Sequence, residues 1–173
     1  MMTHAYSELY LDDAMLSLGE MLEYAICDCG YEPDMFFSQF ITSGIAEKFG
    51  CGNPKYNVGM SGVELASEVI FLTTGSRLNT PATQHESHGK EYWAGWIMAY
   101  YQWHSGLTFS YMAENGLGVS NVMGMYILHE ADESKFVETA DKIITKHKKE
   151  KPSKLSVVRK NRNCINAVEI VKL

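Results

Sequence analysis

The feature that most constrains the fold is an apolar stripe near the N-terminus that repeats with the period of a helix. Between Tyr6 and Cys29, apolar residues recur at alternating steps of four and three positions. Because an α-helix turns once in about 3.6 residues, residues at these steps share one face. We therefore expect one long helix, ended by Gly30, whose apolar face packs in the core; pairing with a second copy of the chain is the alternative. The stripe consists of Leu11, Met15, Leu18, Leu22, Ala25 and Cys29.

Other segments carry helical signals, and none alternates convincingly with the period of two that a half-buried strand shows. The sequence therefore predicts an all-α fold, a compact bundle of about six helices followed by a short basic appendage. Besides the first helix, the expected helices are 34–49, 63–73, 91–105, 108–115, 120–128 and 132–146.

The ends of two of these helices have specific chemistry. Asp34 is a favourable N-cap for the second helix, which would then carry Gly44 in its interior at a cost of about 1 kcal/mol relative to alanine. The run from Ser61 to Glu64 has the spacing of a capping box, in which each side chain bonds the other residue's free backbone N–H. Gly75 would end the helix that this box opens.

The stretch FGCGNPKYNVGMSG, residues 49–62, is rich enough in glycine to suggest a phosphate-binding loop. A Walker-type loop continues with Gly-Lys-Ser/Thr, which is missing here. A dinucleotide-binding fingerprint follows a strand, whereas the residues before this stretch have a helical pattern. We therefore interpret the stretch as a joint between two helices.

Charge is divided unevenly along the chain. Residues 1–141 hold 5 Lys/Arg and 19 Asp/Glu, a net charge of −14, whereas residues 142–173 hold 10 Lys/Arg and 2 Asp/Glu, a net charge of +8. We divide the chain into an acidic all-α domain, 1–146, and a basic hinge with an incomplete helix-turn-helix-like segment, 147–173. The acidic surface either only keeps the protein soluble or binds a basic partner, and the tail either is solvated or contacts nucleic acid.

Catalytic and metal-binding patterns are weak. His85 and His88 are three residues apart in a polar loop with His104 one helix away, whereas metalloprotease histidines are four apart on a helix. A nucleophile elbow, Gly-x-Ser-x-Gly, is absent from the sequence. We therefore expect no enzyme activity, no metal and no cofactor.

Cellular location follows from other signals. The four cysteines are too scattered for a disulfide framework, so we expect all four to stay reduced. The N-terminal sequence lacks the features of a signal peptide, and no apolar run is long enough to span a membrane. We therefore expect a cytoplasmic protein.

The segment EYWAGWIMAYYQWHSG places aromatic residues almost all round one helix. Aromatic stripes at helical spacing usually belong to a core, but tryptophan and tyrosine are also typical anchors of protein interfaces. A ligand pocket or base stacking is a further alternative. The aromatic and apolar residues concerned are Trp93, Trp96, Ile97, Tyr100 and Tyr101.

Several segments together resemble a protein family encoded by mobile elements and phages of gut Firmicutes. The resemblance covers about residues 6–145, and its most distinctive segments are Gly-Asn-Pro-Lys-Tyr and Trp-Ala-Gly-Trp. Many members continue into a helix-turn-helix domain of the phage-repressor class, and LSVVRKNR, residues 155–162, looks like the first helix of that domain. The matching segments are YLDDAM, LGEMLEYA, FITSGIAEKFGCGNPKY, NVGMSGVELA, EYWAGWIMAYYQW and LHEADESKFVETADKI.

The C-terminal part departs from that pattern. The repressor class would continue with a second helix resembling Leu-Ser-Gln-x-Glu-Leu-Ala, whereas this chain continues with CINAVEIV. The residues that follow are too few for a complete DNA-reading unit with its recognition helix. Some short proteins of the same mobile elements are type II-A anti-CRISPRs, which inhibit the nuclease Cas9.

Taken together, the sequence predicts a non-enzymatic interaction protein, most concretely an anti-CRISPR that binds Cas9 and blocks its handling of nucleic acid. The alternative is a helix-turn-helix-type regulator or antitoxin that binds DNA. The expected partner-binding residues are Glu64, Glu68, Trp93 and Trp96. The expected nucleic-acid contacts are Lys148, Lys149, Lys151, Arg159, Lys160 and Arg162.

Overall fold

The computed structural model describes residues 4–150, and within this range the chain is all-α, with nine α-helices and no strand. The predicted fold class is confirmed, with more and shorter helices than the six expected. The α-helices are α1 (Leu11–Glu23), α2 (Pro33–Thr42), α3 (Ile45–Gly50), α4 (Pro54–Asn57), α5 (Gly62–Thr74), α6 (Lys90–Ser105), α7 (Phe109–Glu114), α8 (Val119–Met123) and α9 (Glu133–Glu150). Two short 3₁₀ helices, η1 (Glu8–Tyr10) and η3 (Tyr126–Glu130), and a π-helical segment, η2 (Tyr24–Asp28), complete the list.

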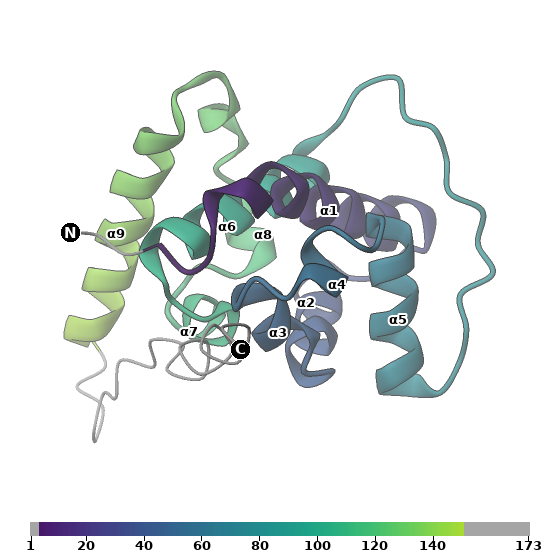
Figure 1. Cartoon of the computed structure of the whole chain (residues 1–173). Coiled ribbons are helices and arrows are strands. Elements are labelled where there is room, and N and C mark those ends of the chain that lie inside the picture. Colours follow the sequence, from purple (N-terminus) through teal and green to yellow (C-terminus); the bar gives the residue numbers. More distant parts are fainter. Residues whose placement is uncertain (1–3, 151–173) are drawn as a thin grey trace, which may run out of the picture.

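Two helices, α1 and α6, form the centre of the molecule. Two contacts show that they run in opposite directions. The Ala5 N–H, before α1, donates to the carbonyl of Trp103 near the end of α6. At the other end, Glu23 of α1 contacts His88, which lies just before α6 begins. Helix α1 also packs against α5, so it lies between α5 and α6 (Figure 1). Helix α9 covers the far side of α6.

The apolar stripe of the first helix faces the core as predicted. Leu18, Leu22 and Ala25 are fully buried, and Leu11 and Met15 nearly so. Because α5 and α6 cover this face, it is not a surface through which a second copy of the chain could pair. The helix changes from α to π geometry at η2 before it ends.

The second predicted helix, 34–49, is in fact two helices, α2 and α3, which are separated at Gly44. Gly44 adopts a left-handed conformation with φ of 79°, which ends α2 and separates it from α3. A left-handed residue cannot continue an α-helix, and glycine adopts this conformation without the steric cost of a Cβ. The N-cap also differs from the prediction: Glu32 caps α2 by accepting from the Met35 N–H at 2.7 Å, and Asp34 accepts instead from the Ser120 N–H at 3.2 Å.

The glycine-rich stretch is a helix joint, as predicted, with one element that was not expected. Helix α3 ends at Gly50, a short α4 follows with Asn53 as its N-cap, and α5 then begins. At α5 the Ser61 hydroxyl accepts from the Glu64 N–H at 3.3 Å, and the Glu64 carboxylate accepts from the Ser61 N–H at 2.9 Å. The predicted capping box is therefore present, and Gly75 ends α5 in the left-handed conformation.

A long loop, residues 76–89, connects α5 to α6 and arches around the molecule (Figure 1). Its middle is tied to η2, more than fifty residues earlier in the sequence. The Tyr24 hydroxyl donates to the carbonyl of Thr80 at 2.6 Å, and Asp28 accepts from the Thr83 N–H at 3.0 Å. The His85 Nε2 lies 3.6 Å from an Asp28 carboxylate oxygen.

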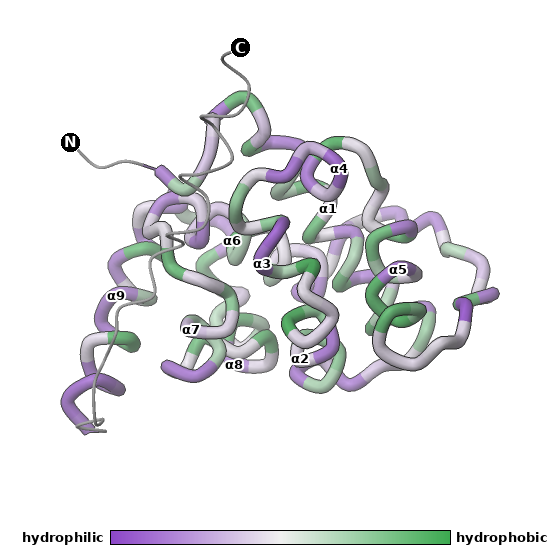
Figure 2. The backbone as a smooth tube through the Cα atoms, turned by 60° about the horizontal axis from the view of Figure 1, so that its bottom comes forward, coloured by the Kyte–Doolittle hydropathy of each residue, from purple (hydrophilic) through white to green (hydrophobic). Residues whose placement is uncertain are grey.

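The predicted boundary between the acidic domain and the basic hinge, at residue 146, falls inside helix α9. It runs without interruption to Glu150, so the residues 147–150 assigned to the hinge are helical. Figure 2 shows that α9 is mainly hydrophilic, and it packs through the few apolar side chains Phe136, Ala140 and Ile144. The remainder of the predicted hinge and the helix-turn-helix-like segment lie outside the described residues.

The structure also describes the state of three cysteines and the character of the helices. Cys27 and Cys29 are free thiols, but Cys51 is disulfide-bonded. The expectation that all four cysteines stay reduced is therefore wrong for Cys51, and cysteine usage no longer argues for one compartment. Across residues 4–150, no helix combines the length and the apolar character needed to cross a membrane.

Candidate functional site

The exposed side of α6 carries a row of four aromatic rings, which we call the aromatic ridge: Tyr92, Trp96, Tyr100 and His104. These residues are four positions apart and each is only partly buried, while the intervening Trp93, Ile97 and Tyr101 point into the core. Residues four apart on a helix are neighbours on its surface. The ridge is continued before the helix by His88, whose ring stacks on Tyr92 with a centroid separation of 3.7 Å.

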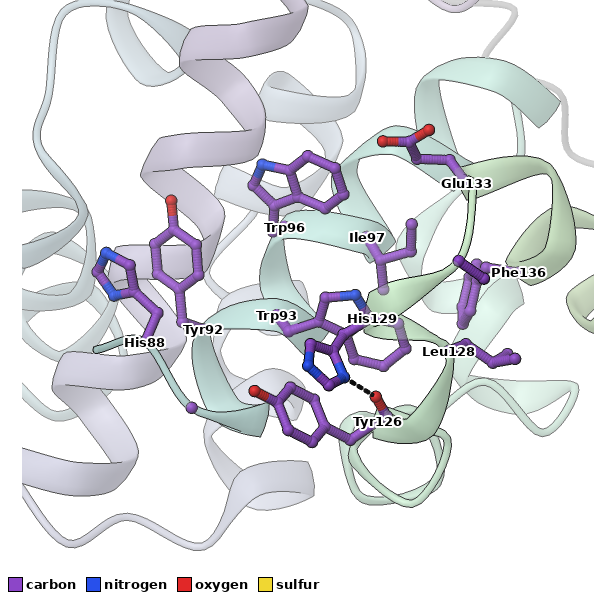
Figure 3. A pocket seen from close by; sticks show the side chains of 12 residues that line it. His88, Tyr92, Trp93, Trp96, Ile97, Tyr126, Leu128, His129, Glu133 and Phe136 are labelled. Atoms are coloured by element: carbon purple, nitrogen blue, oxygen red, sulfur yellow. Dashed lines mark hydrogen bonds between the residues drawn. The ribbon is translucent and has the colours of Figure 1, made fainter.

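A pocket of about 260 Å³ opens beside this ridge, between α6, η3 and the start of α9 (Figure 3). Helix α6 supplies one wall through Tyr92, Trp93 and Trp96. The opposite wall comes from Tyr126 and His129 of η3. The complete lining is His88, Gly89, Tyr92, Trp93, Trp96, Ile97, Tyr126, Leu128, His129, Ala131, Glu133 and Phe136.

The walls of the pocket are held by ring contacts. Trp93, which is 8% exposed, makes edge-to-face contacts with Tyr126 and Phe136, each with a centroid separation of 5.8 Å. The Tyr126 ring stacks on His129 at 4.1 Å, and the His129 Nδ1 lies 2.7 Å from the carbonyl oxygen of Tyr126. Such contacts hold the aromatic walls of the pocket in place.

A single carboxylate belongs to the pocket lining. Glu133, at the first turn of α9, directs its carboxylate toward the side of the pocket occupied by Trp96 (Figure 3). No lysine or arginine belongs to the lining. The combination of several aromatic faces with one carboxylate suits a cation, since ring faces and carboxylates both attract positive charge.

Acidic side chains act electrostatically on two residues of the aromatic ridge, Tyr92 and Tyr100. Burial raises the pKa of the Tyr92 phenol, and the nearby carboxylates of Glu20 and Glu23 raise it further. The pKa of the Tyr100 phenol is likewise raised, first by burial and then by Glu133 and Asp132. Negative charge thus acts on the ridge from α1 on one side and from the start of α9 on the other.

The histidines that were considered as metal ligands contact carboxylates. His88 Nδ1 lies 2.9 Å from an oxygen of Glu23, whose side chain is 9% exposed, and His85 approaches Asp28. In the part of the chain that the structure describes, no three His, Cys, Asp or Glu side chains are arranged to hold a metal ion. Their observed contacts fasten the loop 76–89 to the end of the first helix.

The four predicted partner-binding residues fall into two separate groups. Trp93 and Trp96 meet at the pocket, although Trp93 is a buried wall residue and not an exposed anchor. Glu64 and Glu68 lie on α5, which packs on the other side of α1. Glu64 is engaged in the capping box, which lowers the pKa of its carboxyl, and Glu68 lies 3.9 Å from the Lys55 ammonium.

Of the predicted nucleic-acid contacts, two are described. Lys148 and Lys149 are exposed on the last turn of α9, and the Lys148 ammonium lies 5.6 Å from the centre of the Tyr111 ring. The other four, Lys151, Arg159, Lys160 and Arg162, lie outside the described residues. The two lysines are not part of the pocket lining.

Comparison of the chain with known proteins identified no relative. The chain matches no protein-family model, no curated protein and no solved structure. The interpretation of the pocket therefore depends on its own chemistry.

Sequence reasoning missed the half of the pocket that α6 does not supply. Tyr126, His129 and Glu133 are brought to Trp93 by the fold from a segment more than thirty residues later. A signal for the ridge itself was present, because four rings recur at steps of four from Tyr92 to His104. The lining residues of η3 had no such signal, since a segment of five residues is too short to establish a helical period in the sequence.

Proposed function

We propose that this protein is a non-enzymatic binding protein whose acid-flanked aromatic ridge holds a positively charged segment of another protein. The observation that carries the proposal is the pocket beside the ridge, in which the rings of Tyr92, Trp96 and Tyr126 lie together with the carboxylate of Glu133. Asp132 and Glu133 also act electrostatically on Tyr100, whereas Glu20 and Glu23, which act on Tyr92, are bonded to the Gly62 N–H and to His88.

The charge of the domain supports this proposal through the rate of encounter. Residues 1–141 carry a net charge of −14, and complementary charge accelerates association of protein partners. The aromatic ridge supports it through affinity, because tryptophan and tyrosine contribute most strongly where they enter or form well-packed pockets. Positive charge on the partner would gain from both the carboxylates and the ring faces.

The most concrete partner is a Cas9-type nuclease, because the resembling family belongs to mobile elements that also encode type II-A anti-CRISPRs and because the domain is acidic. Such a nuclease holds nucleic acid in a positively charged channel, and an acidic domain can compete for it. The proposal places the protein in the cytoplasm, where it would act as an anti-CRISPR.

The test is inhibition of cleavage of a matched DNA target by Cas9, with the full-length chain and two charge-neutralised variants. In the first, Asp132→Asn and Glu133→Gln remove two charges beside the ridge; asparagine remains a good N-cap, which matters because Asp132 accepts from the Ser134 N–H at 2.9 Å. In the control, Glu138→Gln and Glu150→Gln remove two charges from exposed ion pairs elsewhere on α9.

We expect the full-length chain and the control to inhibit equally and the ridge variant to need at least tenfold more protein. Inhibition should also weaken as salt rises, because the Debye length falls from about 10 Å at 0.1 M to about 3 Å at 1 M. Absence of inhibition across several Cas9 orthologues contradicts the anti-CRISPR form of the proposal. DNA binding by the isolated protein that is lost on changing Lys148 and Lys149 to glutamate would favour the regulator instead.

A further inference from the structure

We propose that the pocket between α6, η3 and α9 is a receptor for one arginine side chain of the partner, with the guanidinium group against Trp96 and paired with Glu133. This inference rests on the proposed function, and it goes further by naming the chemical group that the pocket accepts.

The size of the pocket favours one side chain over a larger ligand. Its volume of about 260 Å³ lies just below the roughly 300–1,000 Å³ of pockets that hold drug-sized molecules. A peptide would therefore place a single residue inside and leave its backbone on the surface. The ridge continues beyond the pocket through Tyr100 and His104, which gives the neighbouring residues of such a segment an aromatic surface to contact.

The chemistry of the lining favours a cation over an apolar group. Glu133 supplies a carboxylate at the pocket, and Asp132 precedes it at the start of α9. An uncharged apolar side chain would have to remove solvent from Glu133 without replacing the lost interactions, and such desolvation is unfavourable. A bound cation keeps the carboxylate paired, and no lysine or arginine of this protein belongs to the lining.

The shape of the lining favours guanidinium over ammonium. A guanidinium group is planar, stacks on aromatic faces and can present two parallel N–H donors to one carboxylate. The pocket offers ring walls from Trp93, Trp96 and Tyr126 together with the Glu133 carboxylate, and Figure 3 shows the carboxylate on the same side as Trp96. An ammonium group is a compact, strongly hydrated charge that makes less use of flat walls.

The test uses three small probes that share one backbone: N-acetyl-arginine methylamide, its citrulline analogue and its lysine analogue. Citrulline has nearly the shape of arginine and no charge, so it separates charge recognition from shape. Binding to the full-length protein is followed by NMR through the indole N–H signals of Trp93 and Trp96, with Trp103 as an internal control because it does not line the pocket.

We expect saturable shifts of the Trp93 and Trp96 signals with the arginine probe, at least tenfold weaker binding of citrulline and at least threefold weaker binding of lysine. Glu133→Gln and Trp96→Leu should each weaken arginine binding at least fivefold, whereas Glu138→Gln should leave it unchanged. Citrulline or lysine binding within twofold of arginine overturns the assignment, as does an unaltered affinity in Glu133→Gln.

The two proposals can fail separately. If the arginine probe does not bind but Cas9 inhibition remains sensitive to Asp132→Asn and Glu133→Gln, the arginine receptor is wrong and the charged binding face stands. If the probe binds as expected and Cas9 is not inhibited, the receptor stands and the nuclease is not the partner. If the arginine probe does not bind and Cas9 is not inhibited, both proposals are wrong.

Discussion

Gly95 of α6 lies directly against the backbone of Leu18 in α1. A Cβ placed on Gly95 would approach the Leu18 carbonyl oxygen to 2.2 Å and its carbonyl carbon to 2.6 Å. The two central helices therefore pack backbone to backbone at this point, and the aromatic ridge takes its position from that contact. Gly19 makes the reciprocal approach, since a Cβ there would lie 2.9 Å from the Tyr92 ring.

The first prediction concerns this contact. Gly95→Ala should lower the free energy of unfolding by about 3 kcal/mol, the upper end of the usual cost of overpacking, because the neighbouring atoms belong to backbone and cannot move aside without separating the helices. Denaturant unfolding followed by circular dichroism measures the change. Gly124→Ala, at a residue with an ordinary φ of −65°, is the control and should change stability by less than about 1 kcal/mol. Equal stability of Gly95→Ala and the parent would contradict the close packing.

The second prediction concerns the capping box of α5. Ser61→Ala removes the acceptor for the Glu64 N–H and should cost about 1 kcal/mol in the free energy of unfolding. Ser67→Ala, within the same helix, should be neutral or slightly stabilising because alanine has the higher helix propensity. Thermal or urea unfolding compares the two variants.

The capping box also affects how charge reversal on α5 must be interpreted. Glu64→Lys would remove the cap as well as the charge, so a loss of binding in that variant does not identify Glu64 as a partner contact. Glu68→Gln is cleaner, since its contact with Lys55 is a single, partly exposed ion pair of 3.9 Å. We expect Glu68→Gln to fold and to bind partners as the parent does, because α5 lies away from the ridge.

The third prediction concerns the contact that fastens the loop 76–89 to α1. His88→Ala leaves the buried carboxylate of Glu23 without its 2.9 Å partner and should cost about 1–3 kcal/mol. Adding Glu23→Gln should recover part of that loss, because an unpaired amide is less costly to bury than an unpaired carboxylate. A double-mutant cycle by urea unfolding gives the coupling, and a coupling energy near zero would show that the pair contributes nothing.

The fourth prediction concerns the reactivity of Cys27. Cys27 is exposed, but partial desolvation of its thiol, followed by the carboxylates of Glu91, Glu23 and Asp28, raises the pKa of this thiol to about 11. Only the thiolate reacts with iodoacetamide, so at pH 8.5 alkylation of Cys27 should be at least tenfold slower in the folded protein than in the urea-unfolded chain. The rate should continue to rise up to about pH 11.

Mass spectrometry assigns the modified cysteine, which separates Cys27 from its neighbour Cys29. Glu91→Gln should accelerate the reaction of Cys27, because it removes one of the charges that disfavour the thiolate. A folded-state rate within twofold of the unfolded rate would show that the carboxylates do not control this thiol.

The ends of α5 and α6 could be predicted from sequence because their determinants are local. A capping box needs residues three positions apart, and a left-handed glycine such as Gly75 or Gly106 ends a helix through its own backbone. Gly44 shows the limit of that reasoning: the same residue is tolerated inside a helix or ends it, and its environment decided that it separates α2 from α3.

The core face of the first helix was also predictable, since helical period alone places Leu18 and Leu22 on one side. Trp93 was ambiguous, because an aromatic residue on a helix with rings on most sides has no distinct exposed face in the sequence. The packing of α9 and η3 resolved the ambiguity by covering Trp93 and leaving Trp96 partly exposed.

By itself the sequence determined the all-α class, the central helices and the acidic charge, because propensity, periodicity and charge are properties of neighbouring residues. Only the tertiary structure decided the site. The pocket needs Trp96, Tyr126 and Glu133 in one place, and these residues come from three elements that share no local pattern. Their meeting depends on the packing of α9 and η3 against α6, and long-range packing is not encoded in any short stretch of the chain.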